Sequence, residues 1–163
     1  GRWIAESQGG VWLMSDLRDL YQELILDHTK KPRNFRKIEG VGSKADGHNP
    51  LCGDKLTVFL IVDGGIVTDI SFIGSGCAIS MASASMMTES LKGKTIAEAK
   101  TMFGRFHELL TGDLDGPRDP ESLGKLVVFG GVKEFPVRVK CATLAWHTMN
   151  AILEHQEEPV STE

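Results

Sequence analysis

The amino-acid sequence predicts an α+β domain, in which a small antiparallel sheet of about three strands packs against several α-helices. A hairpin pattern stands near the middle of the chain. Two apolar, β-branched stretches at residues 55–62 and 66–73 are joined by Asp-Gly-Gly at 63–65, a turn sequence typical of tight hairpins. One helical segment is expected before this hairpin and three after it. Together these observations are typical of an α+β domain.

The segment before the hairpin predicts one helix and one loop. The helix begins at Ser15, whose side chain can cap its first turn, and runs to about Lys30, since Pro32 ends it. The next stretch, residues 40–50, is rich in glycine and predicts a loop, with room for a short strand before it.

The segment after the hairpin predicts three helices. The first spans residues 80–92 and ends at a glycine. The second begins with a capping box formed by Thr95 and Glu98. A turn-rich loop at 111–121 and a short helical piece follow, and Pro136 then opens the last helix, which we expect to reach about His155.

Length and composition indicate one globular domain. The chain has 163 residues, of which 41% are hydrophobic and 25% charged, values ordinary for a globular protein. The formal net charge of -4 gives no reason to expect nucleic-acid binding. No apolar run approaches the roughly 20 residues of a membrane span, so no membrane partner is expected.

The chain ends are expected to lie outside this domain. We assign the domain to residues 14–155, because Met14 resembles a natural start, and we expect residues 1–13 to be a non-native or disordered extension. Residues 156–163 form a polar C-terminal tail. The first residues lack the pattern of an export signal, so we expect a cytoplasmic location. The three cysteines are therefore structural, metal-binding or reactive rather than paired in disulfides.

Cys52 and Asp54 flank a single glycine just before the first predicted strand. In extended chain these two side chains project to the same face. A thiolate and a carboxylate side by side repel each other unless a cation lies between them, and both are good zinc or iron ligands. The pair therefore suggests half of a metal site.

The other two cysteines are also placed near the ends of elements. Cys77 precedes a predicted helix, where free backbone N–H groups favour a thiolate, and Cys141 lies early in the last helix. With Cys52 and Asp54 they would make four S and O ligands, which suit tetrahedral zinc or a small iron–sulfur cluster. The alternative stays open that Cys141 is a buried apolar residue and Asp54 an ordinary turn residue.

Five separate motifs resemble those of the U-type iron–sulfur cluster assembly proteins, the NifU N-terminal/IscU/SufU family. They are LYQELILDHTKKPRNF (20–35), GHNPLCGDKL (47–56), FIGSGCAISMASASMMTE (72–89), LKGKTIAEA (91–99) and VRVKCATLAW (137–146). They agree in order and spacing from about residue 16 to residue 155. The resemblance implies an IscU/SufU-like fold, with Cys52, Asp54, Cys77 and Cys141 at a common metal or cluster site.

Two departures favour the SufU branch. IscU-type scaffolds carry a histidine where this chain has Lys140, and the stretch from Phe103 to Pro136 is longer than in those scaffolds. Similarity to SufU implies zinc held by three cysteines and one aspartate. It implies that Cys52 accepts persulfide sulfur from a SufS-type cysteine desulfurase, for delivery toward a SufBCD-type scaffold or apo iron–sulfur acceptor proteins. Such a protein is an accessory carrier, at most a sulfurtransferase that acts with the desulfurase.

Two other readings remain open. The same residues are similar to the ligands of a scaffold, on which Cys52, Cys77 and Cys141 would hold a labile [2Fe–2S] cluster or iron. A zinc-binding module without sulfur chemistry is the other. Among further candidates, His48 is close enough in sequence to be a neighbour or exchange ligand of the site, and Arg138 and Lys140 would place positive charge near it.

Overall fold

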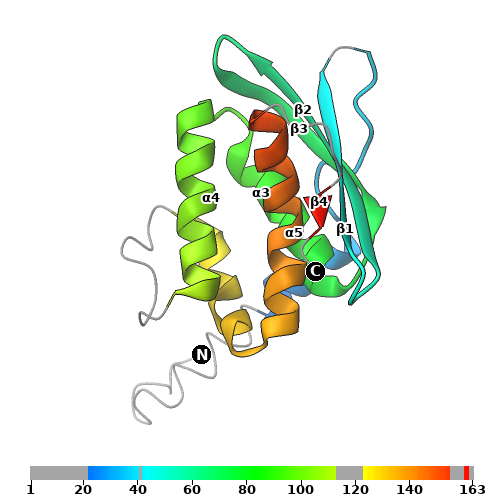
Figure 1. The fold of residues 1–163 in the computed structure, drawn as a ribbon, viewed down its shortest axis with the longest axis vertical. Helices are drawn as coiled ribbons and strands as arrows, with labels where there is room; N and C mark the ends of the chain where they lie inside the picture. Colours follow the sequence, from blue (N-terminus) through cyan, green and yellow to red (C-terminus); the bar gives the residue numbers. More distant parts are fainter. Residues whose placement is uncertain (1–21, 41, 113–122, 155–159, 162–163) are drawn as a thin grey trace, which may run out of the picture.

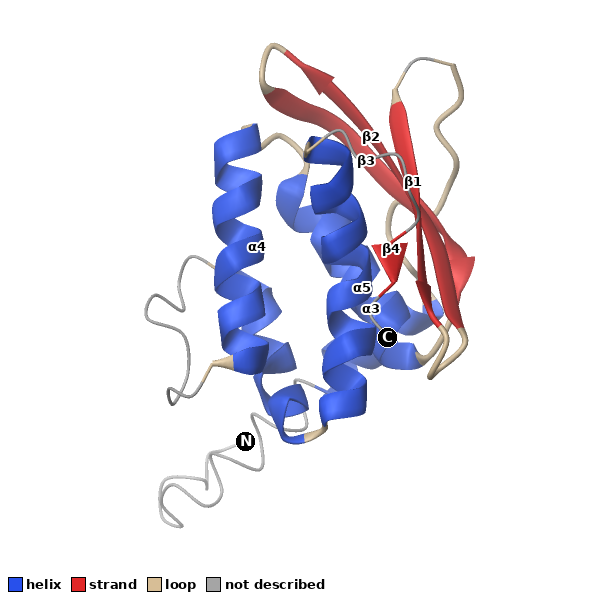
Figure 2. Cartoon of the chain, in the orientation of Figure 1, coloured by secondary structure: helices blue, strands red, loops and turns tan. Residues whose placement is uncertain are grey.

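The computed structural model describes residues 22–40, 42–112, 123–154 and 160–161. Its elements, in chain order, are a helix at 22–30, β1 (Ser43–Asn49), β2 (Asp54–Asp63), β3 (Ile66–Ser75), α3 (Ala78–Leu91), α4 (Ile96–Thr111), the 3₁₀ segment η2 (Gly124–Glu134), α5 (Pro136–Leu153) and β4 (Val160–Ser161). The sheet order is β3-β2-β1-β4. The helices gather on one face of the sheet, with α3 and α5 between the sheet and α4 (Figures 1 and 2). The predicted α+β class is confirmed.

The predicted hairpin forms the centre of the sheet. β2 and β3 pair in antiparallel fashion, and Gly64 and Gly65 take positive φ angles of 61° and 78° in the turn between them. Alternate β2 residues are buried against the helices: Leu56, Val58 and Leu60. The turn therefore holds two strands with one apolar face toward the core.

The loop predicted for residues 40–50 is wrong over most of its length, because 43–49 form strand β1. β1 pairs with β2 in antiparallel fashion, and Ala45, Gly47 and Asn49 are buried while the residues between them are exposed. Gly47 is required for packing rather than for a turn, since a Cβ atom there would collide with Thr148 of α5. Sequence reasoning took this glycine for a loop signal.

The predicted helices are present, with shifted ends. α3 begins at Ala78, two residues earlier than expected, with Cys77 as its N-cap. The Thr95–Glu98 capping box of α4 is confirmed. Two residues of the predicted polar tail form β4, which runs parallel to β1 at Gly47 and His48 and adds a fourth strand to the three expected.

Several expectations fall outside the described residues. They are the extension at 1–13, the start of the first helix at 15–21, most of the loop at 111–121, and His155. Within the described ranges, no helix combines the length and the apolarity that crossing a membrane requires.

Buried aromatic rings join the outer helices to α5. The Trp146 indole of α5 stacks on the Phe106 ring of α4 at 4.7 Å between centroids, and Phe129 of η2 meets Phe106 edge-on. All three side chains are fully buried. This packing fixes α5 in place, and Cys141 lies on the same helix.

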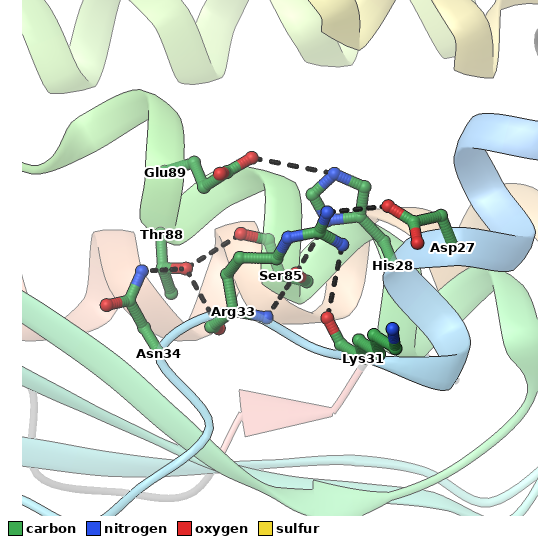
Figure 3. Close-up of polar contacts among 8 residues, drawn as sticks. All are labelled: Asp27, His28, Lys31, Arg33, Asn34, Ser85, Thr88 and Glu89. Carbon is green, nitrogen blue, oxygen red and sulfur yellow. Dashed lines mark hydrogen bonds and ion pairs between the residues drawn. The ribbon is translucent and has the colours of Figure 1, made fainter.

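A polar network fastens the helix at 22–30 to α3 (Figure 3). The buried His28 ring places Nδ1 2.7 Å from Ser85 Oγ and Nε2 3.5 Å from Glu89 Oε1. The backbone N–H of Arg33 also donates to Ser85 Oγ at 2.8 Å, and the Asn34 amide donates to Thr88 Oγ1 at 3.0 Å. The segment after the helix is thereby held along α3.

Candidate metal centre

The β1–β2 turn places Cys52 and Asp54 together. The backbone N–H of Cys52 donates to the Asn49 carbonyl at 3.3 Å, and Gly53 takes a φ of 71°, in the left-handed region that glycine favours. Asp54 is the first residue of β2 and pairs with Asn49 across the ladder. Cys52 is half-buried on the turn, whereas Asp54 is fully buried beneath it.

Cys77 joins this pair from the start of α3. Its backbone N–H donates to Asp54 Oδ1 at 2.8 Å, and its Sγ accepts from the backbone N–H of Ser80 at 3.4 Å. The preceding residue has to be small, because a Cβ on Gly76 would lie 2.5 Å from Asp54 Oδ1. Glycine at 76 therefore lets the backbone approach the carboxylate closely.

Cys141 completes the group from the first turns of α5. Its Sγ lies 3.1 Å from Cys52 Sγ, and one ligand atom from each of Cys52, Asp54 and Cys141 lies within 4.8 Å of the other two. The Cys77 side chain falls outside this group of three, but its backbone N–H donates to Asp54, and Cys77 is among the neighbours that raise the pKa of Cys141. Three separate places in the sequence, the β1–β2 turn, the start of α3 and the first turns of α5, therefore bring the four predicted ligands to one end of the sheet.

The protein environment alone opposes a thiolate at Cys141. Burial raises the pKa of the Cys141 thiol far above its ordinary value, and hydrogen bonds with Cys52 and Asp54 raise it further. Asp54 adds a buried carboxylate, which is costly unless a cation or a proton neutralises it. Three sulfurs and one carboxylate with these properties fit a thiophilic cation such as zinc or iron.

Arg138 brings positive charge to the rim. It lies one helical turn before Cys141, and its pKa is raised above the ordinary value, first by a hydrogen bond with Cys141 and then by the nearby charge of Cys77. A guanidinium in this place favours anionic sulfur. The expectation that Arg138 lies near the site is thus met.

An open groove leads from solvent to the sulfurs. It is lined by Leu51, Cys52, Cys77, Phe135, Val137 and Arg138, among others. Three of its large apolar residues are unusually exposed for their type, at 59% for Leu51, 60% for Phe135 and 50% for Val137. Cys52 and Cys77 therefore face a solvent-accessible surface with an apolar collar, which we define as Leu51, Phe135 and Val137.

The histidine that sequence reasoning considered lies elsewhere. His48 is exposed, on the sheet face opposite the buried Asn49 and Asp54. Sequence reasoning missed Asn49, whose amide donates toward both Asp54 and Cys141. Reading β1 as a strand would have found it, because alternation places residue 49 on the inner face and residue 48 on the outer one.

A family model described as the NifU-like N-terminal domain matches residues 20–142. The chain belongs to this family. Among curated relatives, it is 41% identical over 144 residues to the zinc-dependent sulfurtransferase SufU of Bacillus subtilis, covering 88% of this chain and 95% of that one. It is 37% identical over 141 residues to the iron–sulfur cluster assembly scaffold protein IscU of Streptococcus pyogenes, covering 86% and 87%.

A solved structure agrees with the family assignment. The putative iron–sulfur cluster assembly scaffold protein for the SUF system from Fervidobacterium islandicum superposes with a TM-score of 0.73 at 38% identity, covering 78% of this chain and 92% of that one. The resemblance drawn from the sequence motifs is therefore confirmed, and with it the IscU/SufU-like fold. As a member, the protein is of the iron–sulfur cluster assembly type.

Proposed function

We propose that this protein is a zinc-bound sulfur acceptor, which takes persulfide sulfur from a SufS-type cysteine desulfurase at Cys52. Burial excludes Cys141, whereas Cys52 and Cys77 are both half-buried and face the groove. One observation carries the choice between these two: Cys77 Sγ accepts the backbone N–H of Ser80 as the N-cap of α3, while Cys52 lies on the β1–β2 turn. An acceptor thiol has to meet the thiol of another protein, and a buried one cannot.

The donor set supports zinc. Cys52, Asp54, Cys77 and Cys141 would hold the ion, as four S and O ligands suit tetrahedral coordination. When bound, zinc supplies charge that keeps thiols deprotonated, without redox chemistry of its own. The relative from Bacillus subtilis carries zinc dependence in its name.

The transfer step needs no external oxidant or reductant. The Cys52 thiolate attacks the outer sulfur of the desulfurase persulfide, a new S–S bond forms, and the old S–S bond breaks. The desulfurase cysteine leaves as a thiolate, and the proton of the persulfide stays on the transferred sulfur. Arg138, which lies beside the cysteines, can offset the negative charge that gathers on the sulfurs during attack.

The apolar collar supports docking of a partner protein. Leu51, Phe135 and Val137 surround the groove beside Cys52, and exposed apolar groups that gather around a reactive side chain are typical of an interaction site. We assign this surface to the desulfurase. The SufBCD-type scaffold, or an apo iron–sulfur protein, would then receive the sulfur.

A second function is that of a scaffold for a labile [2Fe–2S] cluster. It is favoured by the grouping of Cys52 and Cys141, with Cys77 at the same groove, and by the similarity to the scaffold protein IscU of Streptococcus pyogenes. In this reading the cluster is cargo that Cys52, Cys77 and Cys141 hold in transit. Lys140, which precedes Cys141 where IscU-type scaffolds carry histidine, supplies no ligand near neutral pH and favours the sulfur-acceptor reading.

The deciding experiment maps the transferred sulfur. The zinc-loaded protein is incubated with a SufS-type desulfurase and cysteine, alkylated, digested and examined by mass spectrometry for a peptide that has gained one sulfur atom. We expect the added sulfur on Cys52, and none on any peptide of Cys52→Ser. Sulfur on Cys77 or Cys141 with Cys52 unmodified, or no transfer to the wild type, would contradict the proposal.

A further inference from the structure

Asn49 is a buried amide at the centre of the cysteine cluster. It is the last residue of β1 and has no exposed surface. Register pairs it with Asp54 across the ladder, so that both side chains lie on the face of the sheet that the helices cover. No motif resemblance and no ligand set assigned it a role.

Asn49 contacts three of the four candidate ligands. Its carbonyl accepts the backbone N–H of Cys52 at 3.3 Å. Its side-chain Nδ2 donates to Asp54 Oδ2 at 3.4 Å and to Cys141 Sγ at 3.6 Å. The second distance is ordinary for a sulfur acceptor, whereas the first is long for an amide and a carboxylate.

The orientation of this amide follows from its neighbours. The Asp54 carboxylate offers only acceptors and the Cys141 sulfur can accept as well, so that the NH₂ group rather than the carbonyl is placed facing them. The Oδ1 atom then points away, and no donor among the described residues reaches it. A buried acceptor left unpaired costs stability, and an apolar residue of similar shape would avoid that cost.

We propose that Asn49 is a positioning residue of the metal centre: its amide hydrogen-bonds to Asp54 and Cys141 and holds both side chains in ligating orientation. The inference rests on the proposed zinc site. Partners of this kind, which hydrogen-bond to the ligands rather than to the metal, set ligand orientation and electron density, and losing one lowers metal affinity by about 10–100-fold.

Asn49→Leu tests this proposal, because leucine branches at the same side-chain atom but donates no hydrogen bond. Zinc affinity is measured by competition with a chromophoric chelator, and Co²⁺ is used as a visible probe of ligand geometry. Unfolding of the metal-free protein in urea is measured in parallel. Ser71→Ala is the matched control, since Ser71 Oγ is also buried and unpaired in the same sheet, away from the ligands.

We expect the zinc dissociation constant of Asn49→Leu to rise by about 10–100-fold and its Co²⁺ absorption bands to shift. The metal-free protein should unfold at an unchanged or higher urea concentration, since the unpaired Oδ1 is gone. Ser71→Ala should leave both metal readouts unchanged. Asn49→Ala serves as a second variant if the larger leucine prevents folding.

Two results would overturn the proposal. In the first, Asn49→Leu keeps the Co²⁺ spectrum and a zinc affinity within about twofold of the wild type, well below the loss expected of such a partner. In the second, the affinity falls only in step with the stability of the metal-free protein, so that Asn49 is structural. If the wild type binds no zinc, both this inference and the zinc site fall. If it binds zinc but accepts no sulfur, only the proposed function fails.

Discussion

Two polar clusters pack against α3, and they differ in how far their polar atoms are satisfied. Around His28 and Ser85, in the network of Figure 3, each contact joins a donor to an acceptor within the protein. Around Cys141 and Asp54, acidic groups crowd together at the start of the same helix. The polar atoms of the first cluster have their partners within the protein, whereas the acidic groups of the second fit a bound cation.

This difference separates structure from function. A complete network stabilises the fold and has nothing left to bind. In the cysteine cluster, the neighbouring thiols and carboxylate raise the pKa of the buried Cys141 thiol. A bound cation would replace the thiol protons and neutralise this group of acids. We therefore expect substitutions in the cysteine cluster to change metal binding, and substitutions in the His28 network to change stability.

The largest expected effect is that of Asp54→Ala on zinc binding. It removes a ligand, so the loss of affinity should exceed the roughly 100-fold upper range of an indirect partner. Asp46→Ala is the matched control, because Asp46 lies on the exposed face of β1, where it accepts a hydrogen bond from Thr57. Chelator competition measures the zinc affinity of both variants. Equal affinities would show that Asp54 is not a zinc ligand.

Gly76→Ala should have the next largest effect on zinc. A Cβ atom at residue 76 would lie 2.5 Å from Asp54 Oδ1, so the carboxylate has to move. We expect a loss of zinc affinity of about 10–100-fold, measured by the same competition. Gly131→Ala is the control, since no atom lies within 4 Å of a Cβ there. A zinc affinity equal to that of the control would mean that Asp54 tolerates displacement.

Ser85→Ala should lower the stability of the fold and leave zinc binding unchanged. It leaves His28 Nδ1 and the backbone N–H of Arg33 without their buried partner, which costs about 1–3 kcal/mol of unfolding free energy. Zinc affinity should stay at the wild-type value. Urea unfolding of the metal-free protein and chelator competition measure the two effects, and a large loss of zinc affinity would show that the clusters are coupled through α3.

The smallest expected effect is on the pH dependence of stability. Burial, and then the charge of Arg33, lower the pKa of His28 below its ordinary value of 6.5. The unfolded chain therefore binds the proton more tightly, so the stability present above pH 6.5 is lost as the pH falls from there toward the folded pKa.

His28→Gln should flatten this dependence, measured as the difference in unfolding free energy between about pH 7.5 and about pH 5.5. His147, whose pKa is also lowered by burial, should leave a residual slope in that variant. His147→Gln is the matched control. A slope in His28→Gln as steep as that of the wild type would mean that folding does not lower the pKa of His28.

The sequence predicts some elements of the fold better than others. The hairpin, the capping box of α4 and the start of α5 follow from local signals: Asp-Gly-Gly, Thr95 with Glu98, and Pro136. Strand β1 does not, because Gly47 serves contact with α5, and a glycine that packs looks the same in sequence as a glycine that turns.

The cysteine cluster shows the same limit. The sequence predicted that Cys52, Asp54, Cys77 and Cys141 share one site. It did not predict how deeply each side chain is buried, because burial depends on how the turn, α3 and α5 pack together. Asn49 was missed because the role we propose for it follows from burial beside two acids, and the residue type alone does not reveal that.

The most direct test of the account is metal and acid-labile sulfide analysis of protein purified without air, with its visible spectrum. A sulfur acceptor built on this cluster should contain about one zinc per chain, as four such ligands suit one tetrahedral ion, with no sulfide and no colour. Iron and sulfide in near-equal amounts with visible absorbance would contradict it and show that the same four residues hold a cluster.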